Sequence, residues 1–505
     1  MKSLEVLVWP LLVGAAVLSC GGDDDPRPAT GGAGGSGATA ATGGAGGTGG
    51  SGGSGAAAGG TGGVGGSSGG AAGAGGGAGG AAPAELAQIV PLSATLEDRL
   101  WAVQFDAQAR VVGAGFVAVD GTGPDTQVAV ARFTPAGALD ASFGTAGVAV
   151  HNVKIGGNVE TARDLKLQAD GKIVVCGVVE HDPTATEPDA DGFVLRFDGT
   201  GVIDTTFGTS GVALVDFGAG GDGASDLLWS CDLDAQDRVV LFASKKQPGS
   251  TSALRDRVIA RLTKDGAVDT TFATAGYFTL DVDGLALSDE SRHGFVQADG
   301  KIFSAGYTPI GGQNEIVLIR LNDDGTPDTT FGGDGVVRHN PLSPGMAEAY
   351  AAVTQSDGKY VTTGYGRSAT SGQVDLVSFR YSAAGVPDTT WGAGGGFLYD
   401  ITGDHDRGRF ALALAGNRIL HVGSGSPSAS TLDAMVLINT PSGGLDTSFN
   451  PAGAEPGVKL YDFGTADEAF FGAAISPGGD WVAAVGYANP GGTQAADSVL
   501  LLLPL

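Results

Sequence analysis

The sequence predicts an all-β chain that forms a seven-bladed β-propeller of four-stranded blades, and three observations carry this prediction. Two short motifs alternate through residues 85–505 with a period of about 60 residues, which is typical of propellers, solenoids and other repeat architectures. Each repeat reads as four short strands. No stretch shows a sustained 3.6-residue apolar period with helix caps.

Composition already excludes several classes of protein. The chain has 505 residues, 90 of them Gly, and a formal charge of −27. Three Cys cannot make a disulfide scaffold. The acidic balance argues against a nucleic-acid partner, whose phosphates need a basic face, and favours cationic or divalent-bridged partners. A hydrophobic share of 42% is enough for a core.

Residues 1–19 have the features of a signal peptide. The apolar run Val6–Leu18 is shorter than the roughly 20 residues that span a bilayer. It ends in Val17-Leu18-Ser19-Cys20, which resembles a bacterial lipobox and implies cleavage before Cys20 and a lipid on its sulfur. The alternative is an ordinary signal peptide with an incidental Cys. We expect a lipid-anchored protein in the cell envelope of a Gram-negative-type bacterium, at the outer membrane or the cell surface. By resemblance to enterobacterial sorting rules, Gly21 does not demand retention at the inner membrane.

Residues 20–84 are predicted to be a flexible linker that follows the anchor. The segment is made mostly of Gly, Ala, Ser and Thr, with four charged residues near its start. Such a composition cannot bury enough apolar surface to offset the entropy of ordering. The propeller is therefore assigned to residues 85–505.

Two motifs define the repeat. The first is an Asp-Gly-Lys turn followed by an apolar run that ends in Gly, as in Asp170–Gly177. We interpret it as a two-residue type I′ hairpin between the second and third strands of a unit. Counting degenerate copies, it occurs seven times. The second is Asp-(Thr/Ala)-(Thr/Ser)-(Phe/Trp), which occurs six times at spacings of 58–65 residues.

The strands follow from these motifs. In the second unit we expect strands near 148–153, 162–167, 172–179 and 192–197. The first unit has its own opening strand near 88–92, and the terminal run 498–503 fills the fourth-strand position of the last unit. A β-solenoid is the main alternative, but its coils are usually much shorter, and a closed ring leaves no exposed sheet edges.

The phrase Arg320-Leu321-Asn322-Asp323-Asp324-Gly325-Thr326-Pro327-Asp328-Thr329-Thr330-Phe331-Gly332 resembles the bacterial delta-60 repeat, which is predicted to form β-propellers. The resemblance covers essentially all of residues 85–505. It implies a propeller fold and a surface or secreted setting, and it supplies no catalytic residues. Unit six departs from the pattern at Asn439 and Asn450, and unit seven stops before the second motif.

An arginine lies eight residues before the Asp of the second motif in five units. This constant spacing favours an ion pair or Arg-to-carbonyl bonds that lock a turn, because a residue repeated in every blade usually serves the blade. The alternative is a ring of Arg that binds an anion in the axial channel. The arginines are Arg132, Arg196, Arg261, Arg320 and Arg380.

The second motif itself suits a turn with an anchor. Its Asp and Ser or Thr can close the turn through bonds to the backbone. Its aromatic residue is expected to pack in the core or between blades. The acids are Asp140, Asp204, Asp269, Asp328, Asp388 and Asp446, and the aromatics are Phe143, Phe207, Phe272, Phe331, Trp391 and Phe449.

No cofactor is predicted, and calcium is the one rival interpretation of the acidic loops. The densest loop carries Asp182, Asp189 and Asp191, and a smaller one carries Asp281 and Asp283 before Gly284. Neither completes a calcium-binding loop.

Other motif matches are weak. Residues 218–223 match a dinucleotide-binding string, but a strand pattern and not a helix follows. Asp404-His405-Asp406 is best explained as a solvated loop, with a metal or acid–base role as the alternative. Cys176 and Cys231 are either two buried thiols, which we favour, or a bridge between neighbouring blades.

These features favour a non-catalytic binding or scaffold module, with an unknown protein or polysaccharide as ligand and the membrane reached through the lipid. Ligand contacts are expected on loops at one end of the axis, with the insertions 179–191 and 244–257 as the first places to look. A propeller-fold hydrolase, lyase or oxidoreductase is the second hypothesis. A purely structural envelope component is the third. No catalytic residues are predicted.

Overall fold

The computed structural model describes residues 84–119, 125–154, 159–181, 189–217, 226–247, 254–282, 284, 287–368, 373–401, 405–428, 431–489 and 495–505. Within these residues the chain is all-β, with one short 3-10 turn at Ala415–Asn417 and no α-helix. None of the described residues forms a helix of the length and apolarity that crossing a bilayer requires.

The strands form antiparallel sheets of the kind expected for a propeller, in which consecutive strands pair side by side. The first three sheets are β2 (Asp98–Phe105), β3 (Val111–Ala118), β4 (Thr126–Phe133) and β5 (Val148–His151); β6 (Val159–Leu167), β7 (Ile173–His181), β8 (Asp189–Phe197) and β9 (Val212–Val215); β10 (Leu227–Leu233), β11 (Val239–Lys246), β12 (Arg255–Leu262) and β13 (Tyr277–Leu280).

The chain continues in the same order. The next sheets are β14 (Glu290–Val296), β15 (Ile302–Ile310), β16 (Gln313–Leu321) and β17 (Val336–His339); β18 (Met346–Ala347), β19 (Ala351–Thr354), β20 (Tyr360–Arg367), β21 (Asp375–Tyr381) and β22 (Gly396–Tyr399); β23 (Arg407–Ala413), β24 (Ile419–Ser428), β25 (Thr431–Asn439) and β26 (Val458–Tyr461).

The sequence predicted that the N-terminal strand opens the first sheet, and this prediction is wrong. Instead β1 (Leu86–Ile89) pairs with β29 (Asp497–Pro504), beside β28 (Trp481–Asn489) and β27 (Asp467–Ile475). The C-terminal run is therefore the third strand of its sheet, and the N-terminal strand is the fourth. Besides its side-chain packing against the preceding sheet, this sheet is joined to it by one parallel backbone pair, Leu432 with Asp467.

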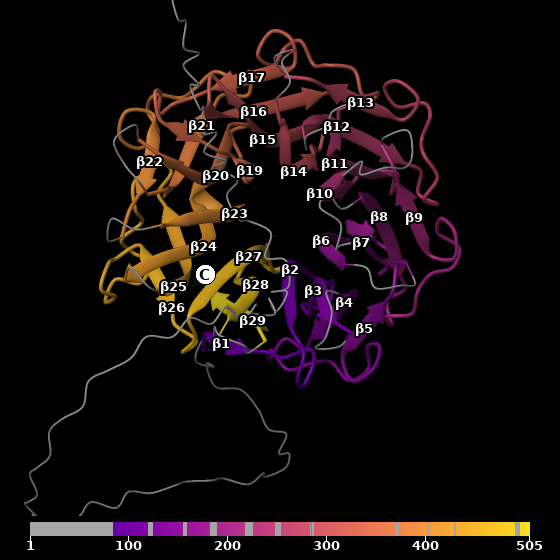
Figure 1. Ribbon diagram of the computed structural model, residues 1–505. Helices are drawn as coiled ribbons and strands as arrows, with labels where there is room; N and C mark the ends of the chain where they lie inside the picture. The colour runs from indigo at the N-terminus through magenta and orange to yellow at the C-terminus, as the bar shows by residue number, and fades with distance from the viewer. Residues whose placement is uncertain are drawn as a thin grey trace, which may run out of the picture. The chain divides into compact units, whose positions relative to one another are not determined.

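The sheets stand around a central axis (Figure 1). The strands β2, β6, β10, β14, β19, β23 and β27 lie innermost, and β5, β9, β13, β17, β22, β26 and β1 lie outermost. Apolar side chains fill the space between neighbouring sheets, so each core cluster draws on two successive repeats.

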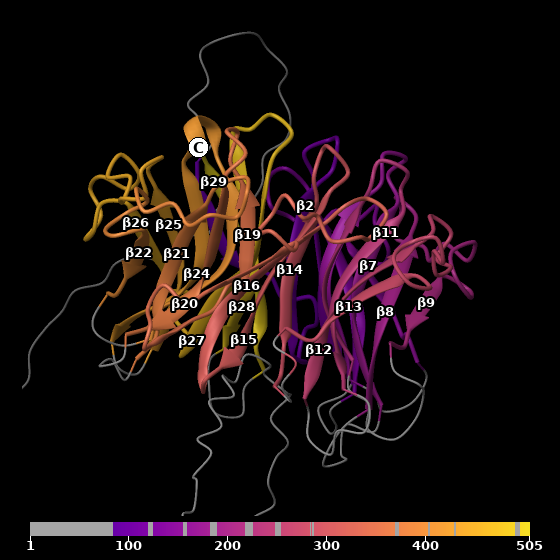
Figure 2. The same cartoon turned by 90° about the horizontal axis from the view of Figure 1, so that it is seen from above.

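Strand order gives the molecule two unlike ends. The turns after the first and third strands of each sheet lie at one end, which we call the turn face, and they hold both repeated motifs. The second and fourth strands of each sheet end at the opposite end, the loop face, seen edge-on with the turn face in Figure 2. Because β1 runs antiparallel to β29, Leu86 and the C-terminal Leu505 both lie at the turn face.

The hairpin of the first motif is longer than the predicted two-residue turn. Gly171 N–H donates to the Gln168 carbonyl, and Gln168 N–H donates to the Lys172 carbonyl, so five residues join β6 to β7. Only Gly171 takes positive φ, at 85°. This geometry matches a type I turn followed by one left-handed residue, which a single Gly satisfies.

Candidate ligand-binding channel

The five repeated arginines lie at the turn face and not along the axis. Arg132 Nε donates to Asp140 Oδ2 at 2.9 Å, and its Nη1 donates to the carbonyl oxygen of Gly199 in the next sheet at 2.6 Å. The guanidinium also stacks over the Phe143 ring at 4.7 Å. Each of these arginines thus joins its own motif Asp and motif aromatic to the following sheet. The same three contacts recur at Arg196, Arg261, Arg320 and Arg380.

Residues of both repeated motifs contact the carboxylate of the second motif. Asp328 Oδ2 accepts from Arg320 and from Lys301, the basic residue of the Asp-Gly-Lys turn, each at 2.7 Å. Its Oδ1 accepts from the Thr330 N–H and hydroxyl. In the first unit the hydroxyl and N–H of Ser142, followed by Arg132, lower the pKa of Asp140 to about 2.

The motif aromatics are anchors. The side chains of Phe143, Phe207, Phe272, Phe331 and Trp391 are fully buried. Phe449 is only half-buried.

The sixth unit departs from this pattern at Asn439. Its amide Oδ1 accepts a hydrogen bond from His421 Nε2–H at 2.8 Å, and the side chain does not reach the next sheet. Arg418, from the neighbouring turn, pairs with Asp446 at 3.1 Å in its place. Burial lowers the pKa of His421 to about 4, so this histidine is neutral at pH 7.

A set of residues that sequence reasoning missed lies on the axis. Three guanidiniums and four aromatic rings alternate around it, each contributed by a different sheet. Arg163 stacks over Trp101 at 4.4 Å and over Trp229 at 4.9 Å. The ring, called here the collar, consists of Trp101, Arg163, Trp229, Arg292, Tyr350, Arg409 and Phe471.

The remaining contacts close the collar. Arg292 lies 4.1 Å from the Trp229 ring and 4.6 Å from the Tyr350 ring. Arg409 lies 5.3 Å from Tyr350 and 5.4 Å from Phe471. Phe471 stacks on Trp101 with centroids 4.1 Å apart. Because the collar has seven members, guanidiniums and rings cannot alternate all the way round, and two aromatic rings are neighbours at one place.

The collar residues are aimed at the axis by β-bulges on the innermost strands. The pairing register slips by one residue at Trp101, Arg163, Trp229, Arg292, Arg409 and Phe471, and between Ala347 and Ala351 around Tyr350. A bulge leaves one residue outside the ladder and re-aims its side chain.

One sequence signal could have located these bulges. The Gly that ends the first motif lies opposite most of them, because a Cβ on Gly177 would come within 2.0 Å of the Thr161 carbonyl oxygen. The bulge at Trp229 is the exception, since Ala243 takes the place of this Gly. Gly306, Gly364, Gly423 and Gly486 face an inner-strand carbonyl at similar distances. The Gly therefore marks a close backbone approach and not only a strand end.

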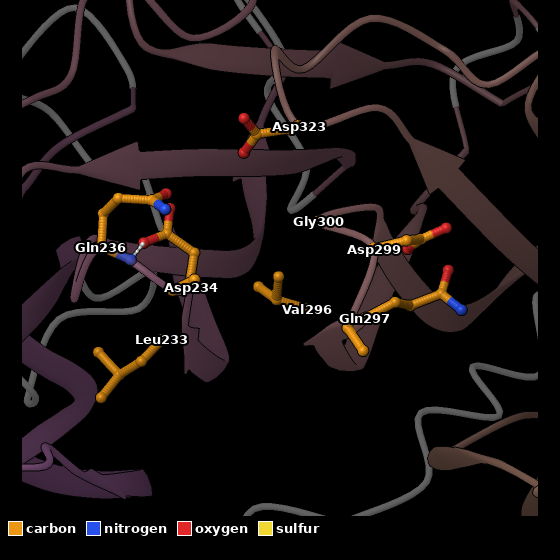
Figure 3. A pocket seen from close by; sticks show the side chains of 10 residues that line it. Leu233, Asp234, Gln236, Val296, Gln297, Asp299, Gly300 and Asp323 are labelled. Carbon is orange, nitrogen blue, oxygen red and sulfur yellow. Dashed lines mark hydrogen bonds between the residues drawn. The ribbon is translucent and has the colours of Figure 1, made fainter.

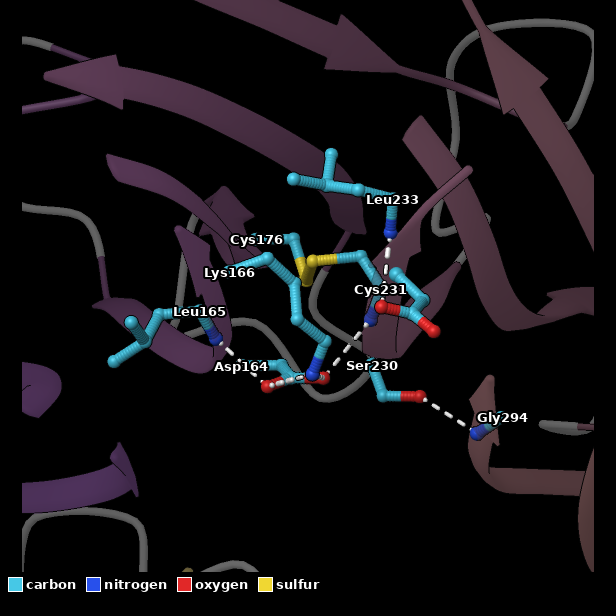
Figure 4. The surroundings of a disulfide bond; sticks show 9 residues. Asp164, Leu165, Lys166, Cys176, Ser230, Cys231, Leu233 and Gly294 are labelled. Carbon is cyan, nitrogen blue, oxygen red and sulfur yellow. Dashed lines mark hydrogen bonds and ion pairs between the residues drawn. A yellow bond between two sulfur atoms is a disulfide. The ribbon is translucent and has the colours of Figure 1, made fainter. Parts of the chain in front are cut away.

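A buried charge cluster directly follows Arg163 of the collar on β6, and Figure 4 shows its members Asp164 and Lys166. Lys166 Nζ contacts both carboxylate oxygens of Asp164 at 3.0 Å, and Asp164 also accepts from the Cys231 N–H at 3.2 Å. The nearby carboxylates of Asp164 and Asp232 raise the pKa of Lys166 against the opposing effect of burial. The ammonium is therefore charged and held in place.

The interpretation of Cys176 and Cys231 as free thiols is wrong. Cys176 of β7 and Cys231 of β10 form a disulfide between neighbouring sheets, with Cα atoms 6.3 Å apart (Figure 4). Both side chains are fully buried. The sequence could not show this, because it does not reveal which faces of successive sheets meet.

Two pockets open on the turn face and share the turn that follows β14. One, of about 650 Å³, is mostly apolar and lies between β14, β19 and β23; its lining includes His293, Phe295, Val353, Phe410 and Leu412. The other, of about 520 Å³, is lined about equally by polar and apolar surface, and its polar residues are Asp234, Gln236, Gln297, Asp299 and Asp323 (Figure 3). Burial lowers the pKa of His293 to about 3, so this residue is a weak base.

A carboxylate also begins each innermost strand. Glu160 Oε2 and Oε1 accept from the Val153 and Lys154 N–H groups of the preceding connection, and burial raises the pKa of Glu160 to about 7. The equivalent acids are almost fully buried and are Asp98, Asp226, Asp289, Glu348, Asp406 and Glu468.

The predicted acidic loops are only partly described. Asp182 and Asp283 lie outside the described residues, as do residues 218–223, Asp404 and Cys20. Asp281 lies with Asp256 and Asp289, whose carboxylate oxygens come within 4.8 Å of one another. Asp289 is already committed to the Val282 N–H, and Asp256 to Gln247. His405 accepts from the Val374 N–H at 3.3 Å, which suits a loop anchor.

Comparison with known proteins supports the fold. Residues 168–207, 249–272 and 297–331 match the family model described as "Domain of unknown function (DUF5122) beta-propeller". No curated protein matches the chain.

Solved structures resemble the chain distantly. A protein of unknown function from Dyadobacter fermentans has a TM-score of 0.45 at 13% identity, covering 83% of this chain and 98% of its own. An ulvan lyase of polysaccharide lyase family PL25 has a TM-score of 0.45 at 8% identity, covering 82% and 95%. The sialidase of Trypanosoma rangeli has a TM-score of 0.39 at 12% identity, covering 69% and 56%. These likenesses say nothing about activity.

Proposed function

We propose that this chain is a lipid-anchored, seven-bladed β-propeller of the delta-60 type that binds a partner at the surface of the bacterial envelope. Cys20 carries the lipid, residues 20–84 form the tether, and residues 85–505 form the propeller. The binding is non-catalytic, and the ligand is a protein or polysaccharide contacted by the loop face.

One observation carries this proposal. The chain enters the propeller at Leu86 on the turn face, and the second and fourth strands of each sheet end at the opposite face. The loop face therefore carries no attachment point of the tether. The described ends of the β7–β8 and β11–β12 connections lie at the loop face, and residues 182–188 and 248–253 lie outside the described residues.

The anchor is tested by fractionation. A Cys20→Ser variant removes the sulfur that takes the lipid, so we expect the protein to move from the membrane fraction to the soluble fraction. The thermal midpoint of the propeller should not change. Equal membrane association of both chains would contradict lipidation at Cys20.

The loop face is tested by ligand-dependent stabilisation against a panel of envelope polysaccharides. A ligand at about 100 times its Kd adds roughly 2.7 kcal/mol to the free energy of unfolding. Replacing residues 182–188 with a short Gly-Ser connection should abolish the shift, and the turn-face change Thr200→Ala should preserve it. A shift lost only in the turn-face variant would contradict the proposed face.

A second function, an enzyme, has one observation in its favour. Lys166, Asp164 and Asp232 gather near His293 beside an apolar pocket, and converging charges at the axis are what a propeller enzyme needs. Turnover of chromogenic polysaccharides that is lost in Lys166→Met and kept in Lys264→Gln would favour this alternative over pure binding.

A further inference from the structure

Three arginines of the collar come together at the axis of a strongly acidic chain. The formal charge of the whole protein is −27, yet the collar brings Arg163, Arg292 and Arg409 into one ring. Net charge predicts cationic partners for the outer surface. It does not describe how charges are placed within the fold, where these three guanidiniums come together at the axis although carboxylates also lie on the innermost strands.

The collar gathers N–H donors around the axis. Each guanidinium lies over both neighbouring rings, at 4.1–5.4 Å from their centroids. A guanidinium carries five N–H donors, of which Arg292 Nη2 donates to the Tyr307 hydroxyl at 2.7 Å. The indoles of Trp101 and Trp229 add one N–H donor each.

Two collar donors are left without partners. The indole Nε1 atoms of Trp101 and Trp229 are buried and have no hydrogen-bond partner among the described residues. A buried unsatisfied N–H costs free energy that a bound acceptor recovers. Trp101 and Trp229 flank Arg163, so an oxyanion between them meets two N–H donors and a guanidinium.

The larger pocket adjoins the collar. His293 directly follows Arg292 on β14, and Phe410 directly follows Arg409 on β23; both line this pocket. His293 Nδ1 is a further buried polar atom without a partner among the described residues. The rest of the pocket is mainly apolar, so the collar and the pocket together offer a charged end and an apolar end.

We propose that the collar binds the carboxylate or sulfate group of an organic anion whose apolar part lies in the 650 Å³ pocket. The ligand enters from the turn face. The site is separate from the loop face, and this proposal does not depend on the proposed surface binding.

The test is fluorine NMR of the full chain labelled with fluorotryptophan, titrated with benzoate. Trp101→Phe and Trp229→Phe variants assign the two collar resonances. Benzoate should shift both and leave the buried Trp391 unchanged. Benzamide, which keeps the ring and lacks the charge, should bind at least ten-fold more weakly. Sulfate alone and glucuronate, which lack the apolar body, should also bind more weakly than benzoate.

Arg292→Gln should weaken benzoate at least ten-fold, because it removes one charged donor from the ring. Lys264→Gln removes the same charge at an exposed turn and should leave the affinity within two-fold. If Arg292→Gln does not fold, Arg409→Lys keeps the charge but loses the planar donor edge and should weaken binding less. Unmoved collar resonances at saturating benzoate, or equal affinity for benzamide, would overturn the proposal. Glucuronate binding more tightly than benzoate would contradict the proposal that an apolar part of the ligand lies in the pocket.

Discussion

The motif aspartate shows how one carboxylate holds a whole repeat. In the fourth sheet Asp328 is contacted by Arg320, Lys301 and Thr330, and these three residues come from different parts of the unit. The salt bridges and hydrogen bonds hold its pKa well below the usual range against the effect of burial. Sequence spacing indicated the Arg–Asp relation, but it did not show that the turn lysine reaches the same atom.

Asp328→Ala should lower the free energy of unfolding by about 3–4 kcal/mol, because it leaves a buried guanidinium without its counter-ion. Urea unfolding measures the change. Asp265→Ala, which breaks an exposed pair with Lys264, should cost less than about 1 kcal/mol. Equal losses in the two variants would show that the motif pair is no stronger than a surface one.

At the scale of elements, neighbouring sheets are fastened at several points. The disulfide links β7 to β10, and the motif arginines reach the following sheet at the turn face. Between the sheets, apolar side chains of successive repeats interlock. A single sheet therefore cannot bury its faces alone, as expected of repeat proteins.

Breaking the disulfide should destabilise the chain by about 2–4 kcal/mol, because the bond closes a loop across a sequence separation of 55 residues. Urea unfolding of Cys176→Ser with Cys231→Ser measures this loss. A reducing agent should lower the stability of the parent chain and leave the double variant unchanged. Finding both cysteines reactive in the denatured, unreduced chain would refute the bond.

The N-terminal strand β1 is short, but we expect it to contribute to the stability of the propeller and to prevent self-association. A chain that begins at Val90 loses β1 and exposes the edge of β29 from Val499 to Leu502. We expect a thermal midpoint lower by about 5 °C or more and self-association through the open edge. A chain that begins at Ala84 is the control. Light scattering and calorimetry report the two effects, and an unchanged, monomeric Val90 chain would contradict this role.

For the whole molecule, we expect the free energy of unfolding to depend on pH through the repeated buried carboxylates. Burial raises the pKa of Asp98, Asp289 and Asp406 to about 6 and that of Glu160 to about 7. A carboxyl group with a raised folded pKa binds its proton more tightly in the folded chain. The free energy of unfolding from these groups therefore increases as the pH falls from about 7 toward 5.

The motif aspartates act in the opposite direction at lower pH. Their folded pKa values lie below the usual range, so their stabilisation is present above about pH 4 and is lost below it. Thermal melts should therefore show maximal stability near pH 5. Glu160→Gln should flatten the slope between pH 5 and 7, whereas Asp265→Ala should not. A stability maximum at pH 8 would contradict this assignment.

The sequence by itself determined the β-class, the four-stranded unit and the places of both motifs, because hydrophobic runs and turn residues act over a few positions of the chain. It also carried a signal for most inner-strand bulges, a Gly whose Cβ would clash with the opposing carbonyl, although Ala243 replaces this Gly at the Trp229 bulge. Only the tertiary structure decided where the ring closes, which cysteines pair and which residues meet at the axis. These depend on contacts between segments more than 50 residues apart, such as Leu86 with Leu502 and Arg292 with Trp229. No local pattern in the chain encodes which face of one sheet will meet the next.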